Sequence, residues 1–282
     1  MNDLNARILS ECIERIDEAS SKKWLSDQVN HLSGGSSFFI AFGRAPKKVG
    51  KQPVILSEKL LDGLKTINPA VDHVTWSLDE LARLVLLVHL PLDERQDTMA
   101  KLIATSDIRE QKLIYKSIQY LEQPEDLEWQ MIDGIRTNIT DVFDAIAMHS
   151  SYPQRYFTEA AWNQMVLKAI FMERAIYRIS GLDERRNADL ARIAIDFAHE
   201  RQSAGRKVTP ELWRLVVPFV DQSIMQDLIR VTGSTDDLER DAALRALSES
   251  DFQPAQTWIK QSHYQTDPRT WTTIGEAIYN TK

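Results

Sequence analysis

Three polar side chains within one apolar helix are the first sign of possible chemistry in this chain. The segment 162–171 is apolar on nearly every side, yet it carries Asn163, Gln164 and Lys168. A helix that is apolar all round is normally buried, and buried amide and ammonium groups need polar partners. We therefore predict an internal polar cluster between packed helices. Its further members come from the neighbouring segments: Arg136, Asn138, Asp141, Asp144 and Arg178.

This predicted cluster has two interpretations. A buried ionic network is expensive to desolvate, so it either fixes the register of helix packing or binds the polar group of a ligand. In the second case, the site lies near the connecting segment 150–157, where Tyr152 and Arg155 suit aromatic or anionic groups. The ligand that we expect there is an aromatic or prenylated acid, with Arg155 or Lys168 as its counter-ion.

Catalytic motifs are incomplete. Asp141 and Asp144 lie on neighbouring turns, a spacing with which isoprenoid synthases hold magnesium and diphosphate, but the sequence has no second acidic motif to face them. Asp196 and His199 resemble half of a di-iron motif, again without a second pair, and an ion-paired surface explains them better. We therefore expect no catalytic residue, no metal and no other cofactor. The alternative is an enzyme that acts on an anionic or prenylated metabolite through Asp141, Asp144 and Lys168.

Composition describes an ordinary folded protein with a large core. The chain has 282 residues, of which 43% are hydrophobic and 27% charged. Its net charge of -7 argues against nucleic acid as a partner. A single cysteine, Cys12, excludes an intramolecular disulfide. No apolar run approaches the roughly 18 residues that a transmembrane helix needs, and the N-terminus lacks a signal-peptide core, so we expect a cytoplasmic protein.

Apolar residues recur at helical spacing along almost the whole chain. The run Leu190, Ala194, Phe197, Ala198 is typical, whereas no long segment alternates with a period of two. We predict an all-α fold, an irregular stack of antiparallel helical hairpins that tends towards a repeat-like superhelix. Residues 1–207 would form one helical domain, and residues 208–282 would add short-helix hairpins packed on it.

The segment 33–57 departs from this pattern. It is rich in Gly, Lys and Pro and contains Phe38, Phe39 and Phe42. We predict a long ordered loop, or a short helix followed by an extended segment, whose aromatic side chains are buried on the helical core. The alternative is a mobile lid over a pocket.

Three stretches of the sequence follow a known pattern. They are DIREQ at Asp107–Gln111, FGRAPKKVGKQPVILS at Phe42–Ser57, and the block that starts with YPQRYF at Tyr152 and includes WNQMVLKA up to Ala169. With the residues around them, about 38–207 in all, they resemble the EboA family. Trp162 stands where the family pattern has Phe, and the polar residues beside it are in place.

The resemblance implies a place in a bacterial and algal gene cluster. Its other products resemble a membrane prenyltransferase, a dehydroquinate-synthase-like enzyme and metal-dependent hydrolases, and the cluster is associated with making small metabolites or exporting them towards the cell envelope. The EboA member has no assigned catalytic activity. We therefore predict a non-catalytic accessory protein of an Ebo-type biosynthesis or export pathway. It would bind an aromatic or prenylated metabolite, or other proteins of the same gene cluster.

Overall fold

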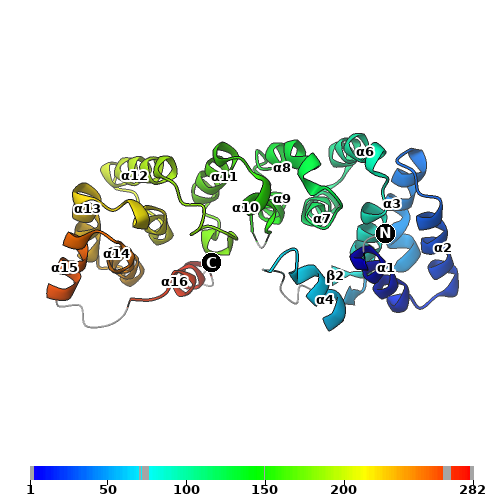
Figure 1. Ribbon diagram of the computed structural model, residues 1–282, viewed down its shortest axis with the longest axis horizontal. Helices are drawn as coiled ribbons and strands as arrows, with labels where there is room; N and C mark the ends of the chain where they lie inside the picture. The colour runs from blue at the N-terminus through cyan, green and yellow to red at the C-terminus, as the bar shows by residue number, and fades with distance from the viewer. Residues whose placement is uncertain (1–2, 70, 72–75, 149, 263–267, 280–282) are drawn as a thin grey trace. The chain divides into compact units, whose positions relative to one another are not determined.

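The computed structural model describes residues 3–69, 71, 76–148, 150–262 and 268–279 (Figure 1). Helices make up almost all of the regular structure in these residues, which confirms the predicted all-α class. The chain divides into two compact units, Met1–Phe157 and Thr158–Lys282, which we call the first and second units. The repeat-like superhelix and the domain boundary at residue 207 stay predictions.

The first unit contains ten α-helices, one 3-10 helix and one pair of short strands among its described residues. Its helices are α1 (Asp3–Arg15), α2 (Ala19–Asn30), α3 (Ser36–Val49), α4 (Glu58–Lys65), α5 (Leu78–Val88), α6 (Leu92–Thr105), α7 (Ile108–Ile118), η1 (Pro124–Leu127), α8 (Glu128–Gly134), α9 (Thr140–Ala147) and α10 (Tyr152–Tyr156). The strands β1 (Pro53–Val54) and β2 (Trp76–Ser77) pair antiparallel.

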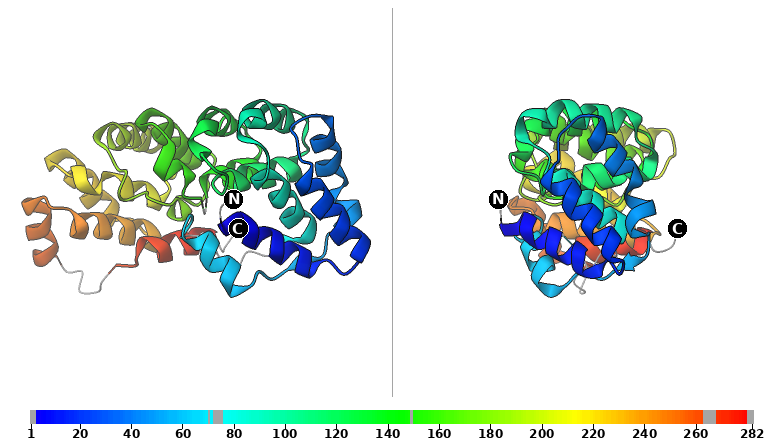
Figure 2. Two further views of the ribbon diagram at one scale, coloured as in Figure 1. Left: turned by 45° about the vertical axis from the view of Figure 1, so that its right-hand side comes forward. Right: turned by 90° about the vertical axis from the view of Figure 1, so that its right-hand side faces the viewer.

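Helix α5 lies at the centre of the first unit. Its sequence LDELARLVLLV has apolar residues on most sides, and every residue from Leu81 to Val88 is buried. A capping box is present at its start, where the Ser77 N–H donates to the Glu80 carboxylate at 3.1 Å. Helices α1, α3 and α7 pack against α5 (Figure 2).

The segment 33–57 contains more helix than the sequence predicts. Helix α3 extends over 14 residues, and the chain becomes extended only after Gly50, whose φ is +89°. Of the two predicted alternatives, the long loop is therefore wrong for most of this segment, whereas a helix followed by an extended segment is present, with a helix longer than predicted. The physical reason is an apolar stripe at helical spacing that outweighs the helix-breaking tendency of Gly43 and Pro46. The stripe consists of Phe38, Ala41, Phe42, Ala45 and Val49, all buried.

The aromatic side chains of α3 lie in the core of the first unit. Phe38 and Phe42 are buried, and their rings stack with centroids 5.9 Å apart. Phe39 is half-buried and meets Phe38 edge-on. The aromatic side chains of the segment thus pack into the helical core, as the sequence predicts, but they project from a helix and not from a loop.

The second unit is also helical in its described residues. Its helices are α11 (Glu159–Phe171), η2 (Ile176–Arg178), α12 (Ala188–Ser203), η3 (Pro210–Phe219), α13 (Gln222–Thr232), α14 (Asp237–Glu249), α15 (Gln253–Gln261) and α16 (Trp271–Tyr279). Helix α14 packs against η3, α13, α15 and α16. Its buried face carries Ala242, Ala243 and Ala246, small side chains that allow neighbouring helices to approach closely.

The length and composition of the helices can be compared with what a membrane-spanning helix requires. Among the described residues, no helix combines the length and the apolar composition that crossing a membrane would require.

Candidate functional site

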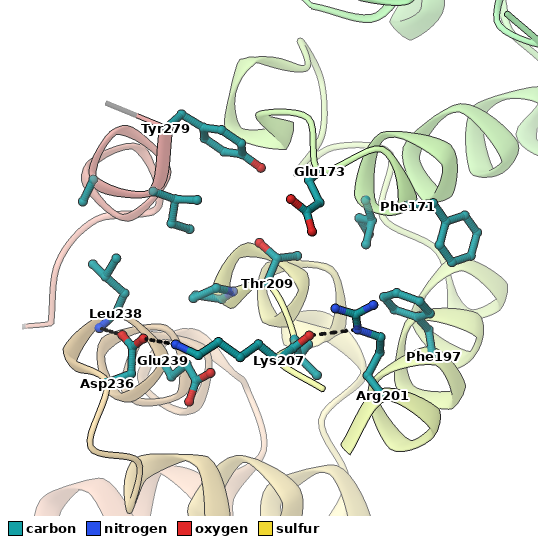
Figure 3. Close-up of a pocket in the computed structure, with 15 residues that line it drawn as sticks. Phe171, Glu173, Phe197, Arg201, Lys207, Thr209, Asp236, Leu238, Glu239 and Tyr279 are labelled. Atoms are coloured by element: carbon teal, nitrogen blue, oxygen red, sulfur yellow. Dashed lines mark hydrogen bonds and ion pairs between the residues drawn. The ribbon is translucent and has the colours of Figure 1, made fainter. Parts of the chain in front are cut away.

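The second unit contains a cavity of about 420 Å³, shown in Figure 3. We call it the second-unit cavity. Its walls come from the end of α11 and the turn that follows, from α12, from the link 207–210, from the start of α14 and from the last turn of α16. Segments more than a hundred residues apart in sequence therefore meet around one space.

The apolar wall of the cavity is built around two phenyl rings. Phe171 and Phe197 meet edge to face, with centroids 4.8 Å apart and planes at 80°. Phe171 is 58% exposed, although it is large and apolar. Leu238 faces them from the opposite side of the cavity (Figure 3). Two apolar walls facing each other can hold the apolar part of a small molecule.

A chain of polar contacts crosses the lower part of the cavity in Figure 3. Lys207 Nζ lies 3.4 Å from Asp236 Oδ2, and Arg201 Nε donates to the Lys207 carbonyl at 2.9 Å. Burial would raise the pKa of Asp236, but the hydrogen bonds from the Leu238 N–H and from Lys207 outweigh burial and hold that pKa below its ordinary value. Asp236 therefore stays a carboxylate and also caps α14.

The other end of the cavity carries oxygen atoms. Figure 3 shows the Tyr279 hydroxyl, the Glu173 carboxylate and Thr209 together there. Tyr279 donates its hydroxyl hydrogen to the Arg174 carbonyl at 2.7 Å, and burial together with the nearby Glu211 carboxyl raises the pKa of Tyr279. The Thr209 Oγ1 atom is buried and has no hydrogen-bond partner in the described part of the chain.

Glu211 is a buried carboxyl group next to the cavity wall. It is fully buried, and its Oε1 atom accepts a hydrogen bond from the Tyr177 N–H at 2.8 Å. Burial raises the pKa of Glu211 to about 7, against the effect of the Tyr177 hydrogen bond and the Arg214 charge. The sequence analysis did not single out this residue. Its position directly before the apolar run LWRLVV is the feature that could have indicated a buried acid.

The family of the chain follows from a family-level comparison. The family model described as "Metabolite traffic protein EboA" matches residues 5–217. The chain belongs to the EboA family. No curated protein and no solved structure matches it. The EboA match includes the parts of the cavity wall contributed by α11, α12 and the link 207–210, whereas the parts from α14 and α16 lie beyond it.

The polar residues predicted from sequence belong to both units of this EboA-family chain. The first unit holds Arg136, Asn138, Asp141, Asp144 and Arg155, and the second holds Asn163, Gln164 and Lys168. A cluster or ligand site that joins the two groups therefore stays a prediction.

Within the first unit, several of these residues lie on the surface. Asp141 pairs with Lys112 at 4.0 Å, and Arg136 pairs with Asp133 at 3.6 Å, all four with exposed side chains. Asn138 and Arg155 are exposed as well, whereas Asp144 is half-buried.

Within the second unit, the three polar residues of α11 differ in their surroundings. Asn163 is nearly buried, and its amide exchanges two hydrogen bonds with Asn187, of 3.1 and 2.8 Å. Gln164 is exposed, and Lys168 is half-buried, with its pKa lowered by burial. The Asn163–Asn187 pair shows that one predicted polar residue has a structural role, because Asn187 also caps α12 through the Leu190 N–H.

The half-motif on α12 is part of an ion-paired surface, as expected. His199 Nε2 lies 2.6 Å from Asp227 Oδ2, and Asp196 pairs with Arg192 at 3.5 Å. Across the residues that the structure describes, no group of three or more His, Cys, Asp and Glu side chains is arranged to hold a metal ion.

Proposed function

We propose that this member of the EboA family is a non-catalytic accessory protein of an Ebo-type metabolite pathway, and that it holds a small molecule in the second-unit cavity. The observation that supports this function best is the cavity itself. It has an aromatic wall, an opposing apolar wall and a few polar groups at its ends, which is the usual make-up of a small-molecule site. The family description also fits a metabolite-associated role.

The rings of Phe171 and Phe197 favour a ligand with an aromatic or prenyl part. Covering apolar surface stabilises a complex by about 25 cal/mol per Å². The half-exposed ring of Phe171 supplies such surface where it already contacts Phe197. Proteins of the same gene cluster are the proposed partners that deliver the ligand or receive it.

The test is direct identification of the bound molecule. The full chain is purified from the cells in which it functions, denatured, and its released small molecules are identified by mass spectrometry. The Phe171→Ala variant should release much less of any enriched compound. Trp129→Ala is the matched control, because Trp129 is also an exposed aromatic, at 69%, but lies in the first unit. Absence of any enriched compound, or equal amounts from Phe171→Ala and wild type, would reject the proposal.

The site predicted from sequence is a second proposed location for the ligand, and the same measurement tests it. Arg155→Ala, Asn163→Ala and Lys168→Ala should each reduce the released compound if that site is correct. If these variants lose the compound and Phe171→Ala retains it, the ligand binds at the site predicted from sequence and not in the second-unit cavity.

A further inference from the structure

The turn that ends α11 holds a glutamate in a conformation that favours glycine. Glu173 has a φ of +51°. Its N–H donates to the Ile170 carbonyl at 3.0 Å, and the Arg174 N–H donates to the Ala169 carbonyl at 2.8 Å. These two bonds form a Schellman motif, in which the left-handed residue is most often Gly. A side chain at this position strains the backbone.

The next α-helix in the chain ends in the same motif with the usual residue. At the end of α12, the Gly205 N–H donates to the Gln202 carbonyl at 3.0 Å, and the Arg206 N–H donates to the Arg201 carbonyl at 2.8 Å. Gly205 has a φ of +66°. The two turns have the same hydrogen bonds, but the turn of α11 adds a carboxylate that lines the cavity (Figure 3). Strain retained beside a cavity indicates a functional reason for the side chain.

The groups next to Glu173 are also suited to accept hydrogen bonds. Tyr279 has given its hydroxyl hydrogen to the Arg174 carbonyl, so any hydrogen bond that its oxygen makes with a ligand is one that it accepts. The buried Thr209 Oγ1 atom has no partner within the described residues and can accept or donate. This end of the cavity therefore matches a ligand group that donates hydrogen bonds.

The cations of the cavity are already engaged. Lys207 pairs with Asp236, and the Arg201 guanidinium lies over the Phe197 ring, 5.7 Å from its centroid, while its Nε binds the Lys207 carbonyl. An anionic head group would have to displace these contacts and would approach the carboxylates of Glu173 and Glu239. The charges thus disfavour an acid in this cavity.

We infer that the cavity selects a ligand whose head group donates hydrogen bonds to Glu173, Thr209 and Tyr279, and whose apolar part lies against Phe171 and Phe197. The head group is a set of hydroxyls or a protonated amine. This inference rests on the proposed function and names the class of ligand for the same cavity. It differs from the acid that the sequence predicts at Arg155 or Lys168.

Three probes with the same tail test the head group. Octyl glucoside, octylammonium and octyl sulfate are titrated into the full chain below their critical micelle concentrations, and their Kd values are measured by calorimetry. We expect at least one of the first two to bind about tenfold more tightly than octyl sulfate, because a hydrogen bond to a charged group contributes about that factor. Glu173→Gly should remove this difference.

Two variants complete the design. Glu173→Gln keeps an acceptor oxygen but loses the charge, so it should weaken octylammonium and leave octyl glucoside nearly unchanged, which separates the two head groups. Gln123→Gly is the matched control, because Gln123 is a non-glycine residue of the first unit with a φ of +47°, and it should change no Kd.

The outcomes separate the inference from the proposed function. Equal binding of all three probes, all weakened by Phe171→Ala, would overturn the head-group inference and leave the proposed function standing. Tighter binding of octyl sulfate, or unchanged selectivity in Glu173→Gly, would overturn the inference as well. If no probe binds to the cavity, the inference fails, whereas the proposed function is still decided by the compounds released from wild type and Phe171→Ala.

Discussion

Individual residues of the second unit occupy environments that oppose their ordinary preferences. Glu173 has a glycine-like backbone conformation, and Glu211 is a fully buried carboxyl group. Both belong to segments that line or adjoin the second-unit cavity. Substitution of these residues should therefore have unusual effects on the unfolding free energy and on its dependence on pH.

Glu173→Gly should stabilise the protein. Glycine removes the strain of the left-handed conformation, while it adds some freedom to the unfolded chain, so the net gain in unfolding free energy is up to about 1 kcal/mol. Urea unfolding followed by circular dichroism measures it. Gln123→Gly should give a gain of similar size. A clear loss of stability in Glu173→Gly would mean that the carboxylate supports the fold rather than the ligand.

Glu211 should make the stability of the second unit depend on pH. Its pKa is raised from 4.5 to about 7, so the folded state binds the proton more tightly than the unfolded state. The stabilisation by this bound proton is complete below pH 4.5 and is lost as the pH rises through 7. The total loss in unfolding free energy is on the order of 3 kcal/mol.

The comparison with Glu211→Gln isolates this effect. The amide does not titrate, so the difference in unfolding free energy between wild type and variant should change between pH 5 and 8. Urea unfolding at several pH values, followed by circular dichroism, provides the measurement. A difference that is constant over this range would show that Glu211 does not titrate there.

At the scale of elements, α16 packs closely against Tyr177 of the same unit at Gly275. An added Cβ atom there would lie 2.2 Å from Tyr177 Cδ1 and 2.9 Å from Glu211 Oε1. Gly275→Ala should therefore displace Tyr177 or the helix and lower the unfolding free energy by about 1–3 kcal/mol. Because α16 carries Tyr279, the octyl glucoside Kd should rise as well.

Gly43→Ala in α3 is the control for this prediction. A Cβ atom at Gly43 meets nothing within 4 Å, so the variant should gain up to about 1 kcal/mol from helix propensity. Thermal unfolding of both variants decides the matter. Equal effects of the two substitutions would contradict the close packing at Gly275.

Elements were predictable from the sequence where capping residues and prolines mark their ends. Asn187 caps α12 and Ser57 caps α4, both residue types that favour this position, and Pro210 starts η3. Helix α3 was not predictable in the same way, because Gly43 and Pro46 resemble breakers while tertiary packing of the phenylalanines decides the outcome.

The second-unit cavity could not be predicted from sequence for a different reason. Phe171, Leu238 and Tyr279 each look like ordinary helix residues, and only the packing of distant segments brings them together. Glu173 also gives no local signal, because a Schellman turn is recognised in sequence by its glycine. The sequence does single out the polar residues of α11, but one of them, Asn163, is hydrogen-bonded to Asn187, the residue that caps α12.

At the scale of the whole molecule, each unit has its own buried core. Leu84 and Phe143 are fully buried in the first unit, and Trp213 and Leu247 are buried in the second. The second-unit cavity takes all of its lining residues from the second unit. Ligand affinity should therefore respond to the packing of the second unit and not to the packing of the first.

Leu84→Ala tests this separation. Removing a buried leucine side chain should lower the unfolding free energy of the first unit by about 2–5 kcal/mol. Under native conditions, the octyl glucoside Kd should keep its wild-type value. Hydrogen exchange of the η3 amides in increasing urea should show an unfolding transition of the second unit with an unchanged midpoint. Leu247→Ala is the counterpart in α14, and it should shift that transition and weaken the probe. If Leu84→Ala weakened the probe as strongly as Leu247→Ala, binding would depend on the first unit too, and the proposed site would have to include it.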